Sequence, residues 1–241
     1  PEVPAETLQS EGRVSLVTID GVLWQEATTR MPAITDWAVL GDRSAGSRVN
    51  TSSRTPLSLP GYHALMTGHT TDCDSNRCGR MGIETLPESL VRRLDLPRRS
   101  VGVFASWAVI PDAAASTDSP PFVLDSEASD AAPWPNARTD AETWARAMAF
   151  LTTHQPRFLW VSLLDSDEHA HRKEWDGYLS AIDQYSVWME ELQQTVDDLG
   201  LTEQTTIILT TDHGRGRGPF WHSHGRLPAG RHMFLAATGP W

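Results

Sequence analysis

The 241 residues are enough for one α/β domain with a full-sized core, or for two small domains. The formal charge of −11 argues against a nucleic-acid backbone or an anionic membrane surface as the main partner. No apolar run reaches the ~20 residues that a membrane-spanning helix needs, so we expect no membrane span.

The N-terminal part contains a buried strand followed by a polar segment. Residues 13–19 form an apolar, β-branched run that predicts a strand and delivers Asp20 at its carboxyl end. Open α/β sheets bind ligands at that end of their strands, so Asp20 is a candidate ligand, although Asp-Gly is also a common turn. Residues 27–57 are polar, and we expect an irregular loop there. Because the first residue is Pro1 rather than Met, we also expect the native N-terminus to be missing.

A helix with a candidate nucleophile follows. Pro60 suits its first turn and Gly68 its end, which places Ser58 at or just before the helix N-terminus. There the free N–H groups favour an anion next to the hydroxyl, but such a serine is more commonly a simple N-cap. The two cysteines, Cys73 and Cys78, suit either a local disulfide or two free thiols. A disulfide is the interpretation we favour, and it would suit an exported protein.

Strands and helices then alternate to the end of the chain. The expected helices cover residues 86–94, 139–153 and 174–199. The further expected strands cover residues 101–105, 157–164, 205–211 and 233–237. Residues 110–136 are rich in Ala, Ser, Asp and Pro, and we expect a surface excursion or lid there. The alternation predicts a single α/β domain over residues 1–241, a three-layer sandwich whose mainly parallel central sheet has helices on both faces.

Two polar clusters follow the later strands. Their candidate ligands are Asp165, Asp167, His169, His171, Asp212, His213, His222 and His224. Carboxylate oxygens and imidazole nitrogens bind zinc and similar divalent ions. For any single one of these residues a solvated polar loop is the better explanation. Together with Asp20 and Ser58, however, they supply enough ligands for two metal ions and a hydroxyl that a metal could activate.

Four blocks share their order and chemistry with one enzyme superfamily. They are Val17-Thr18-Ile19-Asp20-Gly21, Ser58-Leu59-Pro60-Gly61-Tyr62, Asp167 to His171, and Thr211-Asp212-His213-Gly214. In these blocks the chain resembles the alkaline phosphatase superfamily, and is most similar to its nucleotide pyrophosphatase/phosphodiesterase branch and bacterial relatives. The resemblance implies a hydrolase of small phosphate mono- or diesters with two divalent ions, zinc in preference to manganese. No nucleic-acid polymer is expected as a partner.

The resemblance also implies roles for individual residues. One metal would be held by Asp20, Asp212 and His213 with the nucleophile Ser58, and the other by Asp167, His171 and His224. Asn76 stands where the family often has a phosphate-binding Asn. Spacing cannot choose between Asp165 with His169 and Asp167 with His171, but the bacterial pattern Asp-Glu-aromatic-Ala-His favours the later pair. The family's Ser-His-Gly likewise favours His224 over His222.

The implied mechanism is attack of Ser58 on phosphorus, followed by hydrolysis of a phospho-seryl intermediate. The Ser58 N–H and Asn76 would bind the phosphoryl oxygen. Ser58 stands where the branch usually has Thr, and the glycine expected after His171 is missing. Relatives continue beyond the position of Trp241, so we expect the chain either to be truncated or to lack its last residues.

Other functions are compatible with parts of this pattern. Sulfatases share the superfamily fold, but the block after Ser58 lacks the Arg that they need. A phosphonate hydrolase is a close neighbour and stays open. Related phosphoglycerate mutases and phosphopentomutases carry larger inserted domains than this chain can hold. A non-catalytic metal-binding pseudoenzyme is the remaining alternative, and the retained hydroxyl and ligands argue against it.

Overall fold

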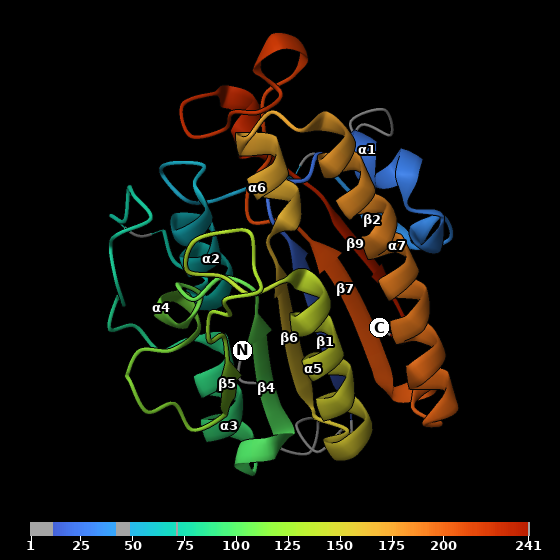
Figure 1. Cartoon of the computed structure of the whole chain (residues 1–241). Helices are drawn as coiled ribbons and strands as arrows, with labels where there is room; N and C mark the ends of the chain where they lie inside the picture. The colour runs from blue at the N-terminus through green and yellow to red at the C-terminus, as the bar shows by residue number, and fades with distance from the viewer. Residues whose placement is uncertain (1–11, 42–48, 71, 241) are drawn as a thin grey trace.

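The structure is a computed structural model that describes residues 12–41, 49–70 and 72–240. Its centre is a seven-stranded sheet with the order β2-β9-β7-β1-β6-β4-β5 (Figure 1). These strands are β1 (Arg13–Ile19), β2 (Ala38–Leu40), β4 (Val101–Ala105), β5 (Val123–Asp125), β6 (Phe158–Leu163), β7 (Thr205–Thr210) and β9 (Leu235–Thr238). The strands from β7 to β5 in that order are parallel, and β9 runs antiparallel to both of its neighbours. The mainly parallel sheet is therefore confirmed.

Helices cover both faces of the sheet (Figure 1). They are α1 (Trp24–Arg30), α2 (Ser58–Thr67), α3 (Leu86–Leu94), α4 (Pro111–Ala114), α5 (Asp140–His154), α6 (Asp165–His171) and α7 (Trp175–Asp198). In β6, Leu159 and Val161 pack with α1, α5 and α7, whereas Phe158 and Trp160 pack with α2, α3 and α4. All six residues of the strand are buried, and all but Ser162 are apolar, because neither of its faces meets water. The expected three-layer α/β sandwich is confirmed.

Smaller elements complete the described chain. Strands β3 (Val49–Asn50) and β8 (His232–Met233) form a separate antiparallel ribbon. Short 3-10 helices are η2 (Pro32–Ile34), η3 (Arg98–Ser100), η4 (Thr202–Gln204), η5 (Gly218–Phe220) and η6 (Pro228–Arg231). Cys73 and Cys78 form the disulfide that we favoured from the sequence. Among the residues that the structure describes, no helix is long and apolar enough to cross a membrane.

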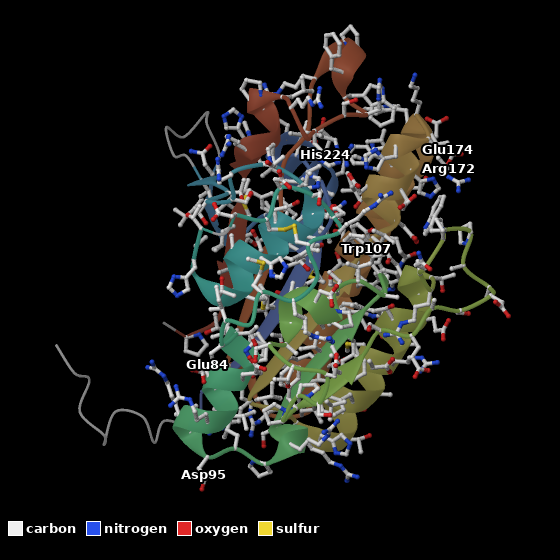
Figure 2. All side chains as sticks on the ribbon, turned by 90° about the vertical axis from the view of Figure 1, so that its left-hand side faces the viewer. Glu84, Asp95, Trp107, Arg172, Glu174 and His224 are labelled. Carbon is white, nitrogen blue, oxygen red and sulfur yellow. A yellow bond between two sulfur atoms is a disulfide. The ribbon has the colours of Figure 1, made fainter. Side chains whose placement is uncertain are left out.

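The carboxyl ends of three central strands lie side by side at one edge of the sheet. Strand β1 lies between β6 and β7, and Ile19 at its end is in register with Leu163 at the end of β6. Side chains that follow these strands therefore meet at this edge, which α6 and the loop after β7 cover (Figure 1). Figure 2 shows His224 at this end of the molecule and Asp95 at the opposite end.

The expectation of an irregular loop over residues 27–57 is wrong. The segment contains most of α1 and the edge strand β2, while residues 42–48 lie outside the described part of the chain. Strand β2 has three residues and pairs with β9 alone, so it is too short to show an alternating pattern. Helix α1 buries only Ala27, which leaves no apolar stripe in the sequence.

The segment 110–136 is more closely built into the fold than a surface excursion would be. It supplies α4 and strand β5, which pairs with β4 at the sheet edge, and it buries Phe122 and Trp134. The Trp134 indole N–H donates to Asp165 Oδ1 (2.6 Å), so the last part of the segment packs on α6. Its Ala- and Pro-rich composition gives no sign of these contacts.

Candidate metal centre and nucleophile

Four donor atoms converge at the carboxyl ends of β1 and β7. Asp20 follows β1, Asp212 and His213 follow β7, and Ser58 is the first residue of α2. Ser58 Oγ lies 3.2 Å from His213 Nε2 and 3.4 Å from Asp20 Oδ1. His213 Nε2 lies 3.5 Å from Asp20 Oδ1 and 3.3 Å from Asp212 Oδ2. All four side chains are buried. We call them the first donor group.

These spacings fit a divalent metal ion. Ligands bonded at about 2.0–2.1 Å to a tetrahedral ion lie ~3.3 Å from one another, close to the spacings found here. Asp212 Oδ2 is buried and has no hydrogen-bond partner among the described residues, an unfavourable arrangement that a bound cation would relieve. His213 Nδ1 donates to the carbonyl of Gly214 (2.9 Å), which leaves the Nε2 lone pair directed at the group.

The electrostatics of the first donor group also favour a bound cation. Burial, and next the carboxylates of Asp212 and Asp167, raise the pKa of Asp20 well above its usual range. Burial followed by Asp167 raises the pKa of Asp212 to about 7. Burial lowers the pKa of His213 to about 4, so this imidazole is neutral and able to bind a metal. A divalent cation would bring both carboxyl groups back to the ionised form.

A second donor group, Asp167, His171 and His224, adjoins the first. Asp167 and His171 lie one turn apart on α6, with His171 Nε2 2.9 Å from Asp167 Oδ2. His224 Nε2 is 3.1 Å from His171 Nε2 and 3.9 Å from Asp167 Oδ1. His224 Nδ1 donates to the carbonyl of Pro56 (2.8 Å), so its Nε2 also faces inward. The rings of His213 and His224 stack with their centroids 3.8 Å apart, which joins the two groups.

The second donor group is also suited to a metal. Donor atoms of its members Asp167 and His224 lie within 4.8 Å of one another and of His213 in the first donor group. Burial lowers the pKa of His224 to about 3, which keeps this imidazole neutral. The hydrogen bond from His171 to Asp167 raises the pKa of His171. His171 is exposed, so this group is the one that opens to solvent.

The structure places the alternative ligands elsewhere. Asp165 accepts a hydrogen bond from Trp134, and His169 Nδ1 lies 2.7 Å from a carboxylate oxygen of Glu174. His222 Nδ1 contacts the hydroxyl of the adjacent Ser223 (3.0 Å). Of the two pairs with equal spacing, the structure thus brings the later one, Asp167 with His171, to His224.

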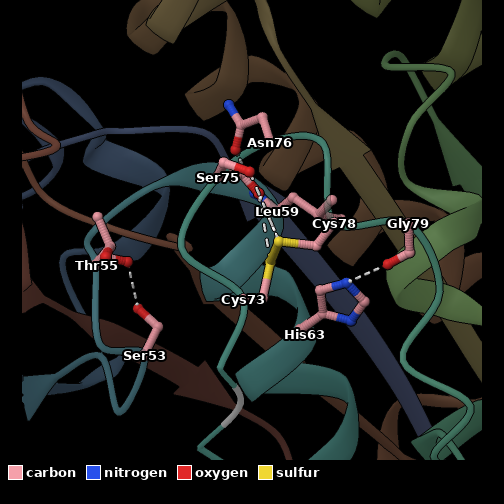
Figure 3. Close-up of a disulfide and its surroundings, with 9 residues drawn as sticks. All are labelled: Ser53, Thr55, Leu59, His63, Cys73, Ser75, Asn76, Cys78 and Gly79. Carbon is pink, nitrogen blue, oxygen red and sulfur yellow. Dashed lines mark hydrogen bonds between the residues drawn. A yellow bond between two sulfur atoms is a disulfide. The ribbon is translucent and has the colours of Figure 1, made fainter.

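Asn76 lies beside Ser58 at the start of α2. Its Oδ1 accepts a hydrogen bond from the backbone N–H of Leu59 (3.0 Å) in the first turn of α2. Figure 3 shows the amide nitrogen of Asn76 pointing away from this contact, and the Cys73–Cys78 disulfide closes the loop that carries Asn76. The side chain therefore caps the helix with its oxygen and retains two N–H donors for a ligand.

A buried arginine is the functional candidate that the sequence did not reveal. Arg215 is fully buried, donates to the carboxylate of Asp167 and to the carbonyl of Gly21, and so links the second donor group to the end of β1. In the sequence it belongs to a Gly-rich loop, where an arginine is typical of the surface. Its position directly after Asp212-His213-Gly214 is the one signal that could have singled it out.

A buried carboxylate fixes the turn between β6 and α6. Asp140, the first residue of α5, accepts hydrogen bonds from the backbone N–H groups of Leu164 (2.8 Å) and Asp165 (2.9 Å). The Tyr185 hydroxyl donates to Asp140 (2.7 Å) and accepts from the Ser166 N–H (3.1 Å). These contacts hold the start of the helix that carries the second donor group.

Comparison with known proteins connects the site to a family. A model of the family described as type I phosphodiesterase / nucleotide pyrophosphatase matches residues 88–224. This range contains Asp167, His171, Asp212, His213 and His224, whereas Asp20 and Ser58 precede it and join the site through the fold. A comparison with curated protein sequences gave no significant match.

Solved structures share the fold at low sequence identity. A 2-O GAG sulfatase has 12% identity and a TM-score of 0.69, covering 95% of this chain and 64% of its own. Alkaline phosphatase from the Antarctic bacterium TAB5 has 13% identity and a TM-score of 0.61, covering 95% and 91%. The lipoteichoic acid synthase LtaP from Listeria monocytogenes has 11% identity and a TM-score of 0.63, covering 99% and 69%. The chain thus spans less than two thirds of the length of the sulfatase. The fold is that of the alkaline phosphatase superfamily.

Proposed function

Because the chain belongs to the type I phosphodiesterase / nucleotide pyrophosphatase family, we propose that it is a metal-dependent hydrolase of phosphate esters, with phosphodiesters as the first class to test. The observation that carries the proposal is the first donor group. A serine hydroxyl at a helix N-terminus lies 3.2 Å and 3.4 Å from two of the three buried residues whose spacing fits a metal ion. A purely structural serine does not require such neighbours.

We propose that the first donor group holds one divalent ion and the second donor group another. The mixed nitrogen and oxygen ligands favour zinc, with manganese as the alternative. When bound, the ions would supply positive charge that makes the Ser58 hydroxyl more acidic and stabilises negative charge on the reacting phosphate.

The residues of the chain orient the nucleophile. Asp20 Oδ1 and neutral His213 Nε2 are both acceptors, so the Ser58 hydroxyl donates to one of them and its lone pairs remain available. In the proposed reaction Ser58 Oγ bonds to phosphorus, the ester P–O bond breaks, and the alcohol leaves with a proton. Water then attacks the phospho-seryl group, breaks its P–Oγ bond and releases phosphate or a phosphomonoester.

The negatively charged phosphoryl oxygens need hydrogen-bond donors, and those nearest to Ser58 lie at the start of α2. We propose the Ser58 N–H at the start of the helix and the amide N–H groups of Asn76 for this role. The dipole of α2 favours negative charge at the same place. The substrate is then a small phosphate ester. The disulfide between Cys73 and Cys78 supports an exported location.

The test is hydrolysis of bis-p-nitrophenyl phosphate and p-nitrophenyl phosphate after chelation, with zinc or manganese restored. We expect turnover that depends on metal and falls by at least about a thousandfold in Ser58→Ala. Ser119→Ala, at an exposed serine, is the matched control and should leave turnover unchanged. Hydrolysis of p-nitrophenyl sulfate in place of both phosphate esters would assign the sulfatase alternative. Binding of metal without turnover of any ester would assign the pseudoenzyme.

A further inference from the structure

A pocket of about 400 Å³ opens between α1, the start of α7 and the loop after β7. Three of its lining residues form an aromatic wall: Trp175, Tyr178 and Trp221 have ring centroids 4.8 to 5.8 Å apart. Arg215 also lines the pocket and donates to Asp167, so the pocket adjoins the second donor group. None of the proposed metal ligands lines it.

Two hydrogen-bond acceptors of this pocket lack partners. Gln25 Oε1 and Glu26 Oε2 are buried atoms from adjacent residues of α1, and neither accepts a hydrogen bond from any described residue. Glu26 forms no ion pair within the described part of the chain. Burial raises the pKa of Glu26, although its own backbone N–H and the charges of Arg217 and Arg215 oppose the shift. Buried acceptors in this state require a donor from outside the chain.

The charges around the pocket indicate which donor fits. The buried guanidinium of Arg215 is neutralised by Asp167. Arg217 is exposed, so its side chain can turn towards solvent. An anion would leave Gln25 Oε1 and Glu26 Oε2 unpaired, and so would a purely apolar ligand. A protonated amine supplies up to three N–H donors and a positive charge, and its carbon chain can lie against the aromatic wall.

We propose that this pocket binds the primary ammonium group of an organic ligand through Gln25 and Glu26. The ammonium donates to the unpaired acceptors, and the alkyl part packs on Trp175 and Trp221. This inference stands apart from the proposed hydrolysis, because it uses neither Ser58 nor the donor groups. The ammonium belongs either to one arm of the phosphate ester or to a separate ligand.

Equilibrium binding to chelated Ser58→Ala protein tests the site without catalysis. The probes are n-butylammonium and butan-1-ol, which have the same chain and differ in charge and donors. We expect the amine to bind at least about tenfold more tightly, the size expected for one hydrogen bond to a charged group. Glu26→Gln should remove this preference, and Glu203→Gln, at an exposed site on η4, should keep it.

Three outcomes would overturn the proposal: equal affinity for the two probes, a preference that survives Glu26→Gln, or tetramethylammonium binding as tightly as n-butylammonium. Arg217→Gln should strengthen amine binding, because it removes a positive charge that lines the pocket and acts on Glu26.

Kinetics with chromogenic diesters distinguish the two sources of the ammonium. The substrates are p-nitrophenyl aminoalkyl phosphates of increasing chain length and their alkyl counterparts. If the amine belongs to the substrate, kcat/KM favours the aminoalkyl ester at one chain length in wild type and loses that preference in Glu26→Gln. Probe binding without a kinetic preference assigns a separate ligand. If no diester is hydrolysed, the proposed function fails, but the binding experiment still shows whether the pocket binds a primary ammonium group.

Discussion

The guanidinium of Arg215 donates a hydrogen bond to the carboxylate of Asp167, and both side chains are buried. Burial raises the pKa of Asp167, but Arg215 and then His171 hold it well below its usual range. The second donor group therefore contains a permanent positive charge beside its carboxylate. A metal ion bound there shares Asp167 with this cation, which weakens its attraction to the site.

Arg215→Met should consequently strengthen metal binding at the second donor group. In chelated protein the same change should lower the free energy of unfolding by about 3 kcal/mol, because Asp167 loses its buried partner. Metal titration with a competing chelator and urea unfolding measure the two effects. Arg217→Met, at the exposed neighbour, should change neither. Metal affinity that is unchanged or weaker in Arg215→Met would contradict the argument.

Gly21 packs directly against Arg215 and Asp167. Its φ is +61°, and a Cβ there would meet Arg215 and Asp167, at 2.5 Å for the Asp167 Oδ1. Gly200 has a φ of +68° and no atom within 4 Å of the same position. Gly200→Ala should therefore cost about 1 kcal/mol of stability from backbone conformation alone. Gly21→Ala should cost a further 1–3 kcal/mol or so and disturb metal binding, as urea unfolding and metal titration would show.

Two substitutions separate the proposed roles of Asn76. Asn76→Asp keeps an oxygen for the Leu59 N–H but replaces the amide donors by negative charge. We expect its stability to stay near wild type and its kcat/KM to fall by about a hundredfold or more. Asn76→Ala should also lose about 1 kcal/mol of stability, because the helix cap is removed. Equal kcat/KM in wild type and Asn76→Asp would show that the amide does not contact the phosphate.

Metal affinity should depend on pH through the first donor group. In metal-free protein the pKa of Asp212 is about 7, so below that pH a metal ion must displace its proton. His213 and His224, with pKa values of about 4 and about 3, hold no proton near neutrality. Asp20, whose pKa is also raised, holds a second proton that the metal displaces. Affinity should therefore rise with pH through this range by about tenfold per unit for each proton displaced. Calorimetry in buffers of different ionisation enthalpy measures the released protons.

The raised pKa of Asp212 also predicts how the stability of the metal-free protein changes with pH. Between pH ~4 and ~7 the folded, chelated protein holds a proton on Asp212 that the unfolded chain has released. Its stability should therefore fall as pH rises through this window, relative to Asp212→Asn. The difference should change by on the order of 1 kcal/mol per pH unit. A difference that is constant across the window would place the Asp212 pKa near its ordinary value.

Much of this candidate site could be predicted because its residues follow elements with clear sequence patterns. Asp20 and Asp212 come directly after buried apolar strands, and parallel strands bring such ends together whatever their distance in the chain. The short helix α6 was not predicted, since seven residues with few apolar positions show no helical stripe. Its one-turn geometry nevertheless explains why the spacing of Asp167 and His171 suits a shared ligand.

The unpredicted parts depend on contacts between distant residues. The pairing of Arg215 with Asp167 spans 48 positions, and nothing in a Gly-rich loop distinguishes a buried arginine from a solvated one. The aromatic wall of the pocket combines α7 with the loop after β7 in the same way. The sequence shows residue types and local periodicity, whereas these features follow from how the layers pack.

The carboxylates of the donor groups follow three adjacent strands, which has a kinetic consequence. Asp20, Asp167 and Asp212 come together only after β6 and β7 have paired with β1, and an unfolded chain offers no more than neighbouring ligands such as Asp212 and His213. Pairing of strands so far apart in sequence is a slow step of folding. A bound ion should therefore slow unfolding and leave the refolding rate unchanged. Stopped-flow refolding and unfolding with and without chelator would show whether a bound metal only stabilises the folded sheet or also accelerates its formation.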